Sequence, residues 1–370
     1  MSAAKAAAAA LFQAAGGEPL LRAAGNRWML ASGRGGARLR RRASPPFLIL
    51  IYHRVHPHPG PFMIDPVPPE RFERQMRHLA RAYRPLPLAE LLERSRAGTV
   101  PDGAVAVTFD DGYADNAEYA APILARHGIP ATVFLVTGCI GTGRIPWHDE
   151  VLLAFAAARG GAIRIPGQPA DAPPLPLGTE AERHRAAFLA LGALKPMPEA
   201  ERLAGVRAIR EALGPGDAGA AASLMLDWDR VRGMRGSGIA FGSHTETHPI
   251  LSRVAPERVR DEVVRSKRTI EKELGVEAAF FAYPNGRVED YDDGAVEALR
   301  AAGYRGALTT TFGPNEAGED PFRWRRAAAW SDDPRRFALQ MAWYRFRGPE
   351  PPATGVPTAG RALAGAGGER

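Results

Sequence analysis

The sequence has little cysteine. Cys139 is the single cysteine among 370 residues. One thiol cannot form an intramolecular disulfide, and it cannot build a cysteine-rich metal site. Cys139 follows the apolar run 132–136, which favours a buried structural thiol over a nucleophile, because a nucleophile would need a basic partner. Disulfide scaffolds and cysteine-rich metal domains are therefore excluded.

Long apolar runs are also lacking. The run 46–52 is only about a strand long, whereas a membrane span needs roughly twenty apolar residues. Residues 1–30 are rich in alanine but are interrupted by Lys5, Glu18 and Arg22, so they lack the continuous apolar stretch of a secretory signal. We therefore expect a soluble, cytoplasmic protein.

The overall composition is that of an ordinary globular chain, with 45% hydrophobic and 24% charged residues. The length suits one α/β barrel domain, predicted over 46–346, with extensions at both ends. Residues 1–45 are predicted to be a basic N-terminal extension. Residues 347–370, rich in proline, glycine and alanine, are predicted to be a disordered tail.

Positive charge is in excess, with a formal net charge of +7. Five arginines crowd into the segment 34–42. A solvated basic linker explains them, and no nucleic-acid partner is expected. A peripheral contact of 34–42 with an anionic membrane surface is the alternative, which would make the protein membrane-peripheral.

Short apolar runs alternate with amphipathic segments along most of the chain. Strands are predicted at 47–52, 104–109, 131–136, 239–242, 279–283 and 306–310, with helices between them. This alternation is typical of parallel β/α architecture, either an open sheet or a barrel. Between 147 and 226 the pattern changes to alanine-rich helical stretches, which we interpret as a mostly helical insertion.

Polar residues gather where the predicted strands end, and in parallel β/α folds this edge carries the ligands. Two histidines four residues apart, His244 and His248, can face one direction and form a three-ligand metal site with one carboxylate. Of the adjacent Asp110 and Asp111, one would bind the metal and the other would accept a proton. Chance remains the alternative, because Asp-Asp-Gly is also a common turn sequence.

Two segments, Thr108-Phe109-Asp110-Asp111-Gly112-Tyr113 and His244-Thr245-Glu246-Thr247-His248, resemble the first two motifs of the polysaccharide deacetylase family, carbohydrate esterase family four. Segments around His53, Tyr283 and Thr309 resemble its exopolysaccharide-type branch. The likeness covers roughly 48–337. It implies an α/β fold, an irregular (β/α) barrel of about seven parallel strands.

The resemblance also implies the chemistry. Asp110 would be the general base, and Asp111, His244 and His248 would hold a divalent metal, usually Zn²⁺. The substrate would be an N-acetylated amino sugar in a polysaccharide, a glycolipid or a lipid-linked precursor, and the products an amine and acetate. A backbone N–H near Tyr113 would hold the oxyanion. Tyr283, Pro284 and Asn285 would bind substrate or support the site.

The sequence departs from the family pattern at two positions. Many members carry an arginine where this chain has Ala282, and Arg326 is the candidate substitute; a basic surface strand is the alternative. Many members also end with Leu-x-His, which protonates the leaving amine, but here Leu308-Thr309-Thr310 has no histidine. The acid would then be His53 or His148, unless both are structural.

Two other functions stay open. The same metal and base would cleave an acyl group from a small molecule, so an amide deacylase is one alternative. A non-catalytic glycan-binding protein is the other, because the family histidine and arginine are missing. Against it stands Asp110, which a site that only holds a metal would not need.

Overall fold

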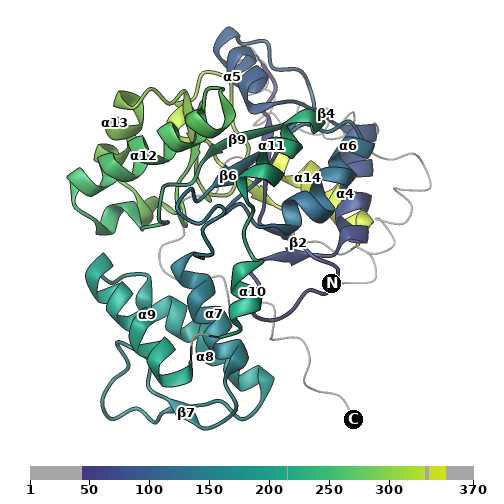
Figure 1. Cartoon of the computed structure of the whole chain (residues 1–370). Coiled ribbons are helices and arrows are strands. Elements are labelled where there is room, and N and C mark those ends of the chain that lie inside the picture. Colours follow the sequence, from purple (N-terminus) through teal and green to yellow (C-terminus); the bar gives the residue numbers. More distant parts are fainter. Residues whose placement is uncertain (1–43, 215, 330–332, 347–370) are drawn as a thin grey trace, which may run out of the picture.

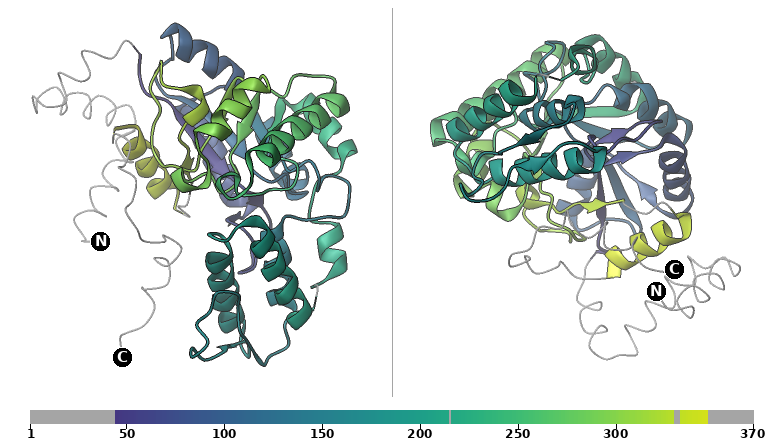
Figure 2. Two further views of the ribbon diagram at one scale, coloured as in Figure 1. Left: turned by 90° about the vertical axis from the view of Figure 1, so that its left-hand side faces the viewer. Right: turned by 90° about the horizontal axis from the view of Figure 1, so that it is seen from below.

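The computed structural model describes residues 44–214, 216–329 and 333–346, with the side chains of 345 and 346 left out. The predictions for the segment 34–42 and for the tail 347–370 therefore lie outside the described residues, as does almost all of the extension 1–45. The described part forms a curled parallel sheet wrapped by helices, with a separate group of helices below it (Figures 1 and 2).

The main sheet contains β1 (Leu48–Tyr52), β4 (Arg84–Pro85), β5 (Ala104–Phe109), β6 (Ala131–Leu135), β9 (Ile239–Ser243), β10 (Phe280–Ala282), β11 (Gly306–Leu308) and β12 (Ala327–Ala328). Seven of these strands follow the order β11-β10-β9-β6-β5-β1-β12, and β4 pairs with the side of β5. All of these pairings are parallel. Every residue of β5 and β6 is buried, as expected for strands covered on both faces.

From β1 to β11 the path of the sheet follows the chain order, β12 lies beyond β1, and the two ends of the curled sheet approach each other. β12 pairs with β1, and Trp324, just before β12, forms a parallel bridge to Leu308 of β11. The result is a curled (β/α) half-barrel of seven parallel strands, which confirms the predicted fold class. Its carboxyl edge therefore collects the segments that follow β1, β5, β9, β10 and β11.

Helices cover the outside of the half-barrel: α4 (Pro69–Ala82), α5 (Leu88–Ala97), α6 (Ala121–Arg126), α11 (Trp228–Met234), α12 (Pro256–Leu274), α13 (Asp293–Ala301) and α14 (Pro334–Phe346). Their apolar sides pack on the strands; in α4, Phe72, Met76 and Leu79 are fully buried. A small parallel pair, β2 (Arg54–Val55) with β3 (Pro66–Val67), lies beyond β1. Among the described helices, none combines the length and the apolar character needed to cross a membrane.

The insertion contains α7 (Trp147–Ala157), β7 (Ala162–Ile163), β8 (Leu175–Pro176), α8 (Glu180–Leu194), α9 (Glu199–Leu213) and α10 (Ala218–Ala222). Its helices α7, α8 and α9 pack together below the half-barrel (Figure 2). They share an apolar cluster of their own, which includes Val151, Phe155 and Leu194 and reaches Ile250 beside the histidine loop. The insertion is thus a second packing unit that contacts the functional edge of the sheet.

Candidate active site

The two aspartates sit in a tight turn directly after β5. Asp111 and Gly112 have φ values of 70° and 81°, in the left-handed region that favours glycine. A Cβ at position 112 would lie 2.8 Å from Leu135 Cδ2, so the turn also needs glycine for space. This sharp turn leaves both carboxylates buried at the carboxyl edge of the sheet.

The two histidines follow β9 in a loop and not in a helix. Thr245 and His248 have φ values of 71° and 60°, which reverse the chain and bring the two imidazole rings to 4.8 Å from each other. The fully buried carboxylate of Glu262 on α12 accepts hydrogen bonds from the backbone N–H groups of Glu246 and Thr247, at 2.7 and 2.8 Å. The histidine pair is therefore held by buried polar contacts from a neighbouring helix.

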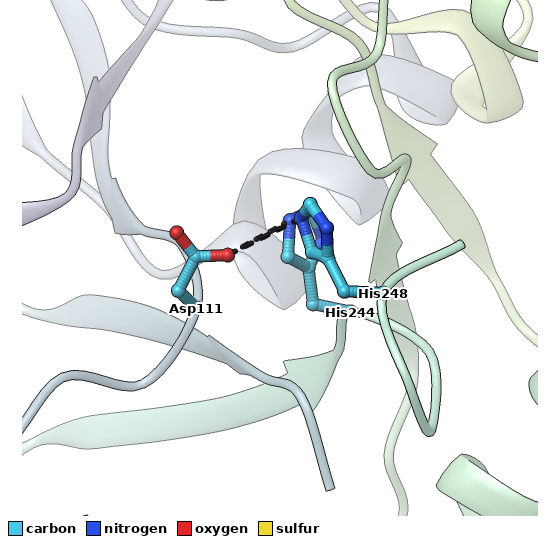
Figure 3. A group of neighbouring side chains, drawn as sticks. All are labelled: Asp111, His244 and His248. Carbon is cyan, nitrogen blue, oxygen red and sulfur yellow. Dashed lines mark ion pairs between the residues drawn. The ribbon is translucent and has the colours of Figure 1, made fainter. Parts of the chain in front are cut away.

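The turn and the loop face each other and form a cluster of three possible metal ligands (Figure 3). The Nε2 atoms of His244 and His248 lie 3.5 and 3.4 Å from Asp111 Oδ1. One ligand atom from each residue lies within 4.8 Å of the others. Asp111 Oδ1 is buried and has no hydrogen-bond partner among the described residues, although a buried carboxylate oxygen needs one.

The chemistry of this cluster fits a divalent cation. His244 Nδ1 donates to the carbonyl oxygen of Ala282 at 2.7 Å, which leaves its Nε2 lone pair directed toward Asp111. Burial lowers the pKa of His244 to about 4 and that of His248 well below its usual value, so both imidazoles are neutral. Burial, together with the carboxylates of Asp149 and Asp110, raises the pKa of Asp111. A bound cation would offset the unfavourable free energy of ionising this buried carboxyl group.

Asp110 is in the opposite electrostatic setting. Arg326 donates to both of its carboxylate oxygens at 2.7 Å, and Arg326 Nε donates to Thr309 O at 2.9 Å. Burial alone would raise the pKa of Asp110, but the charge of Arg326 and its hydrogen bonds to the carboxylate hold it below its usual value. Arg326 is 0% exposed, so the alternative of a basic surface strand does not hold for it.

The insertion reaches the cluster through His148 and Asp149, the second and third residues of α7. His148 Nε2 lies 3.7 Å from Asp111 Oδ2 and 3.3 Å from the hydroxyl of Tyr113. That hydroxyl donates to Asp149 Oδ2 at 2.9 Å. His148 and Tyr113 are therefore packed into one buried polar group behind Asp111.

His53 approaches from the end of β1 and keeps contact with solvent. Its side chain is 19% exposed, and its Nδ1 lies 3.5 Å from a carboxylate oxygen of the exposed Asp65. Its imidazole is near enough to Asp110, His148 and His244 to interact with them electrostatically. His53 therefore borders the site from the solvent side.

Three buried charged residues of this region were missed from the sequence: Arg54, Asp115 and Asp149. Arg54 Nε donates to Asp115 Oδ2 at 2.7 Å, and the Arg54 guanidinium lies 4.8 Å from the centre of the Tyr113 ring. The one signal that could have indicated them is their position in the sequence, because each is one or two residues from a predicted site residue. No pattern in the sequence shows that these charges are buried.

The segment after β10 takes a supporting position. The Tyr283 ring stacks on Tyr291 with 4.1 Å between ring centres, and its hydroxyl donates to Phe322 O at 2.9 Å. Pro284 is also buried, and the Asn285 carbonyl accepts a hydrogen bond from Thr310 Oγ1 at 2.5 Å. The Tyr283 side chain is thus part of the core. Asn285 connects the loop after β10 to the loop after β11.

Comparison with known families decides the assignment. The family model described as polysaccharide deacetylase matches residues 97–307, more than half of the chain. The chain belongs to the polysaccharide deacetylase family. The matched segment carries both aspartates and both histidines of the site, whereas His53 and Arg326 lie outside it.

Individual relatives of this family member are distant. A putative polysaccharide deacetylase of Bacillus subtilis (strain 168), YxkH, is 36% identical over 77 residues, which is 20% of this chain and 28% of that protein. The match to this curated relative thus spans less than a third of its length.

Solved structures extend the likeness over most of the described chain. The Streptococcus pyogenes deacetylase PplD in complex with acetate is similar with a TM-score of 0.54 and 20% identity, covering 80% of this chain and 99% of that one. IcaB from Ammonifex degensii is similar with a TM-score of 0.53 and 18% identity, covering 82% and 98%. At these identities the likeness shows a shared fold.

Proposed function

We propose that this protein is a metal-dependent hydrolase that removes the N-acetyl group from an amino sugar in a polysaccharide, a glycolipid or a lipid-linked precursor. One observation carries the proposal. Two adjacent buried carboxylates are placed in opposite settings, Asp111 against two neutral imidazoles and Asp110 against a guanidinium. Such a division suits one metal ligand and one proton acceptor.

Asp111, His244 and His248 would hold the metal, which we propose to be Zn²⁺, through one oxygen and two nitrogens. When bound there, the metal supplies Lewis-acid activation of a water molecule and of the acyl carbonyl. Asp110 accepts the proton from the attacking water. Arg326 keeps the Asp110 carboxylate ionised and fixes its direction through two parallel hydrogen bonds.

The leaving amine needs a proton, and we propose His53 as its donor. His53 borders the site from the solvent side, where it can exchange protons with water. His148 is enclosed by Tyr113, Asp149 and Asp111, so we assign it and Tyr113 a supporting role at the back of the site. In the same way, we propose that Tyr283, Pro284 and Asn285 support the edge of the sheet.

Acetate release tests the proposal. A panel of N-acetylglucosamine, its oligomers and its polymers would be incubated with protein that has been stripped of metal and then given Zn²⁺ or left without it. We expect Zn²⁺-dependent release that the Asp110→Asn variant loses. Release from the free monosaccharide alone would favour a small-molecule deacylase. No release from any substrate, despite bound metal, would contradict the proposal and favour a glycan-binding role.

A further inference from the structure

A cavity of about 210 Å³ lies between residues of the insertion and residues of the half-barrel, with His248 as part of its lining. Its walls include Trp147 of α7, Glu199 and Arg202 of α9, Thr247 and His248 of the histidine loop, and Arg258 of α12. The mechanism proposed above uses none of these residues except His248. The cavity is thus a separate feature that shares one wall with the metal cluster.

Three of these residues carry buried N–H groups that lack an acceptor. The nitrogens are Trp147 Nε1, Arg202 Nε and Nη1, and His248 Nδ1; within the described residues none of them has a hydrogen-bond partner. Tryptophan and arginine nitrogens can only donate. Unpaired buried polar groups are costly and rare, so four such nitrogens, on three residues that line one cavity, indicate a missing acceptor.

His248 differs from His244 in this respect. His244 Nδ1 donates to the carbonyl oxygen of Ala282, the kind of contact that ordinarily orients a metal-binding imidazole. His248 directs Nε2 toward Asp111 at 3.4 Å and has no such partner for Nδ1. A group bound in the cavity can supply it.

Charge indicates which kind of group this is. The Arg202 side chain is 1% exposed, and the nearest carboxylate oxygen, Glu199 Oε1, lies 3.9 Å from Nη2, beyond hydrogen-bonding distance. Arg258 on the opposite wall is already paired with Glu262 at 2.6 Å. Arg202 is therefore a buried guanidinium that lies over the Trp147 ring, 5.4 Å from its centre, and has only a distant ion pair with the partly exposed Glu199. Its buried charge is poorly neutralised, so a ligand with negative charge would be favourable.

We infer that this cavity is a binding site for an oxyanion, either a phosphate or a carboxylate group, to which Arg202, Trp147 and His248 donate hydrogen bonds. The guanidinium fork matches the paired oxygens of both groups. The oxyanion has two possible sources with the same chemistry, a free anion or an acidic group on the glycan. In either case, its hydrogen bond to Nδ1 would orient the His248 ring.

Phosphate binding to the Zn²⁺-loaded protein tests the inference by titration calorimetry. We expect binding by the wild type that is at least about tenfold weaker in Arg202→Gln, because a charged hydrogen-bond pair is lost. Arg207 is an exposed arginine on the same helix, so Arg207→Gln should bind like the wild type. No binding by the wild type, or equal binding by Arg202→Gln, would overturn the inference; equal binding would place the phosphate at the metal.

Arg202→Lys is the second variant if Arg202→Gln does not fold. Lysine keeps the positive charge but lacks the planar fork, so we expect phosphate binding several-fold weaker than that of the wild type. Phosphate binding unchanged by this substitution would also overturn the inference.

Kinetics then distinguish the two sources of the anion. If a phosphorylated or uronic acid-containing oligomer is preferred over its neutral counterpart, and Arg202→Gln lowers this preference at least about tenfold, the anion belongs to the substrate. If free phosphate binds through Arg202 without such a preference, the ligand is a separate anion. The binding measurement does not need activity, so Arg202-dependent binding without acetate release would contradict only the proposed function.

Discussion

Two buried arginines, Arg326 on the half-barrel and Arg202 on the insertion, lie near the metal cluster and differ in their contacts. Arg326, on the half-barrel, donates to both oxygens of Asp110 and to a backbone carbonyl. Arg202, on the insertion, has no hydrogen-bond partner for its Nε and Nη1 within the described chain. Arg326, whose donors are paired, holds the carboxylate that we propose as the proton acceptor, whereas Arg202, with unpaired donors, suits recognition of a ligand.

The half-barrel and the insertion as a whole also differ in how their polar groups are held. The half-barrel fixes its polar groups through turns with positive φ and through contacts from neighbouring elements, such as Glu262 beneath the histidine loop. The insertion rests on an apolar cluster of its own and presents polar groups to the site edge. We therefore expect catalysis to depend on the half-barrel and ligand selection to depend on the insertion.

The largest expected effect is that of Asp110→Asn. The amide cannot accept the proton from water, so kcat for acetate release should fall by about 10²- to 10⁴-fold. Asp229→Asn, at a side chain that is 92% exposed on α11, is the matched control and should leave kcat unchanged. An Asp110→Asn variant with wild-type kcat would contradict the expectation that catalysis depends on the half-barrel.

Arg326→Met removes the arginine whose donors are paired and leaves Asp110 buried without a counter-charge. We expect the free energy of unfolding to fall by about 3–5 kcal/mol, measured by urea denaturation. Arg323→Met is the control, because its ion pair with Asp293 is largely exposed and should contribute only about 0–1 kcal/mol. Equal losses for the two variants would mean that burial does not distinguish these arginines.

Leu194→Ala tests the independence of the insertion. Leu194 is fully buried in the insertion cluster, so its truncation should lower the free energy of unfolding by about 2–5 kcal/mol. Leu189 on the same helix is 44% exposed, and Leu189→Ala should change this value by at most about 0.5 kcal/mol. Zinc content of the folded Leu194→Ala protein should stay at the wild-type level, since all three ligands lie on the half-barrel; loss of zinc would show that the two regions are coupled.

The smallest effect is expected at Cys139. Burial raises the pKa of this thiol well above its usual value, so little thiolate forms in the folded protein. A thiol reagent such as DTNB should react slowly with the native protein and rapidly after unfolding in urea. Rapid reaction with the native protein would show that this region, next to the site, opens easily.

The sequence predicts the elements well where the signal is local. The short continuous apolar runs predicted β1, β5, β6 and β9 to within a residue or two, because strands buried on both faces are continuously apolar. β12 was missed, since two alanines carry no pattern. α14 was missed as well, and its apolar residues show almost no concentration on one side.

The residues of the site also differ in how far the sequence could predict them. The two aspartates and the two histidines lie in short motifs at strand ends, so residue type and spacing selected them as a group. The choice of Asp111 over Asp110 as the metal ligand came from the resemblance to the family. Arg326 was named as the candidate arginine, but a basic surface strand stayed open as the alternative. Its contact with Asp110 joins residues 216 positions apart and depends on how the sheet closes. The unpaired donors of Arg202 and Trp147 depend on where α9 and α7 dock, which no local pattern records.

The zinc content of two neighbouring variants, Asp110→Asn and Asp111→Asn, tests the central claim most directly. Both proteins would be stripped of metal, reloaded with Zn²⁺, dialysed and analysed by mass spectrometry of the metal. We predict about one zinc per chain in Asp110→Asn, as in the wild type, and a large loss in Asp111→Asn, because we propose Asp111 as the carboxylate ligand. Retention of zinc by Asp111→Asn together with its loss from Asp110→Asn would contradict the division of labour between the two aspartates.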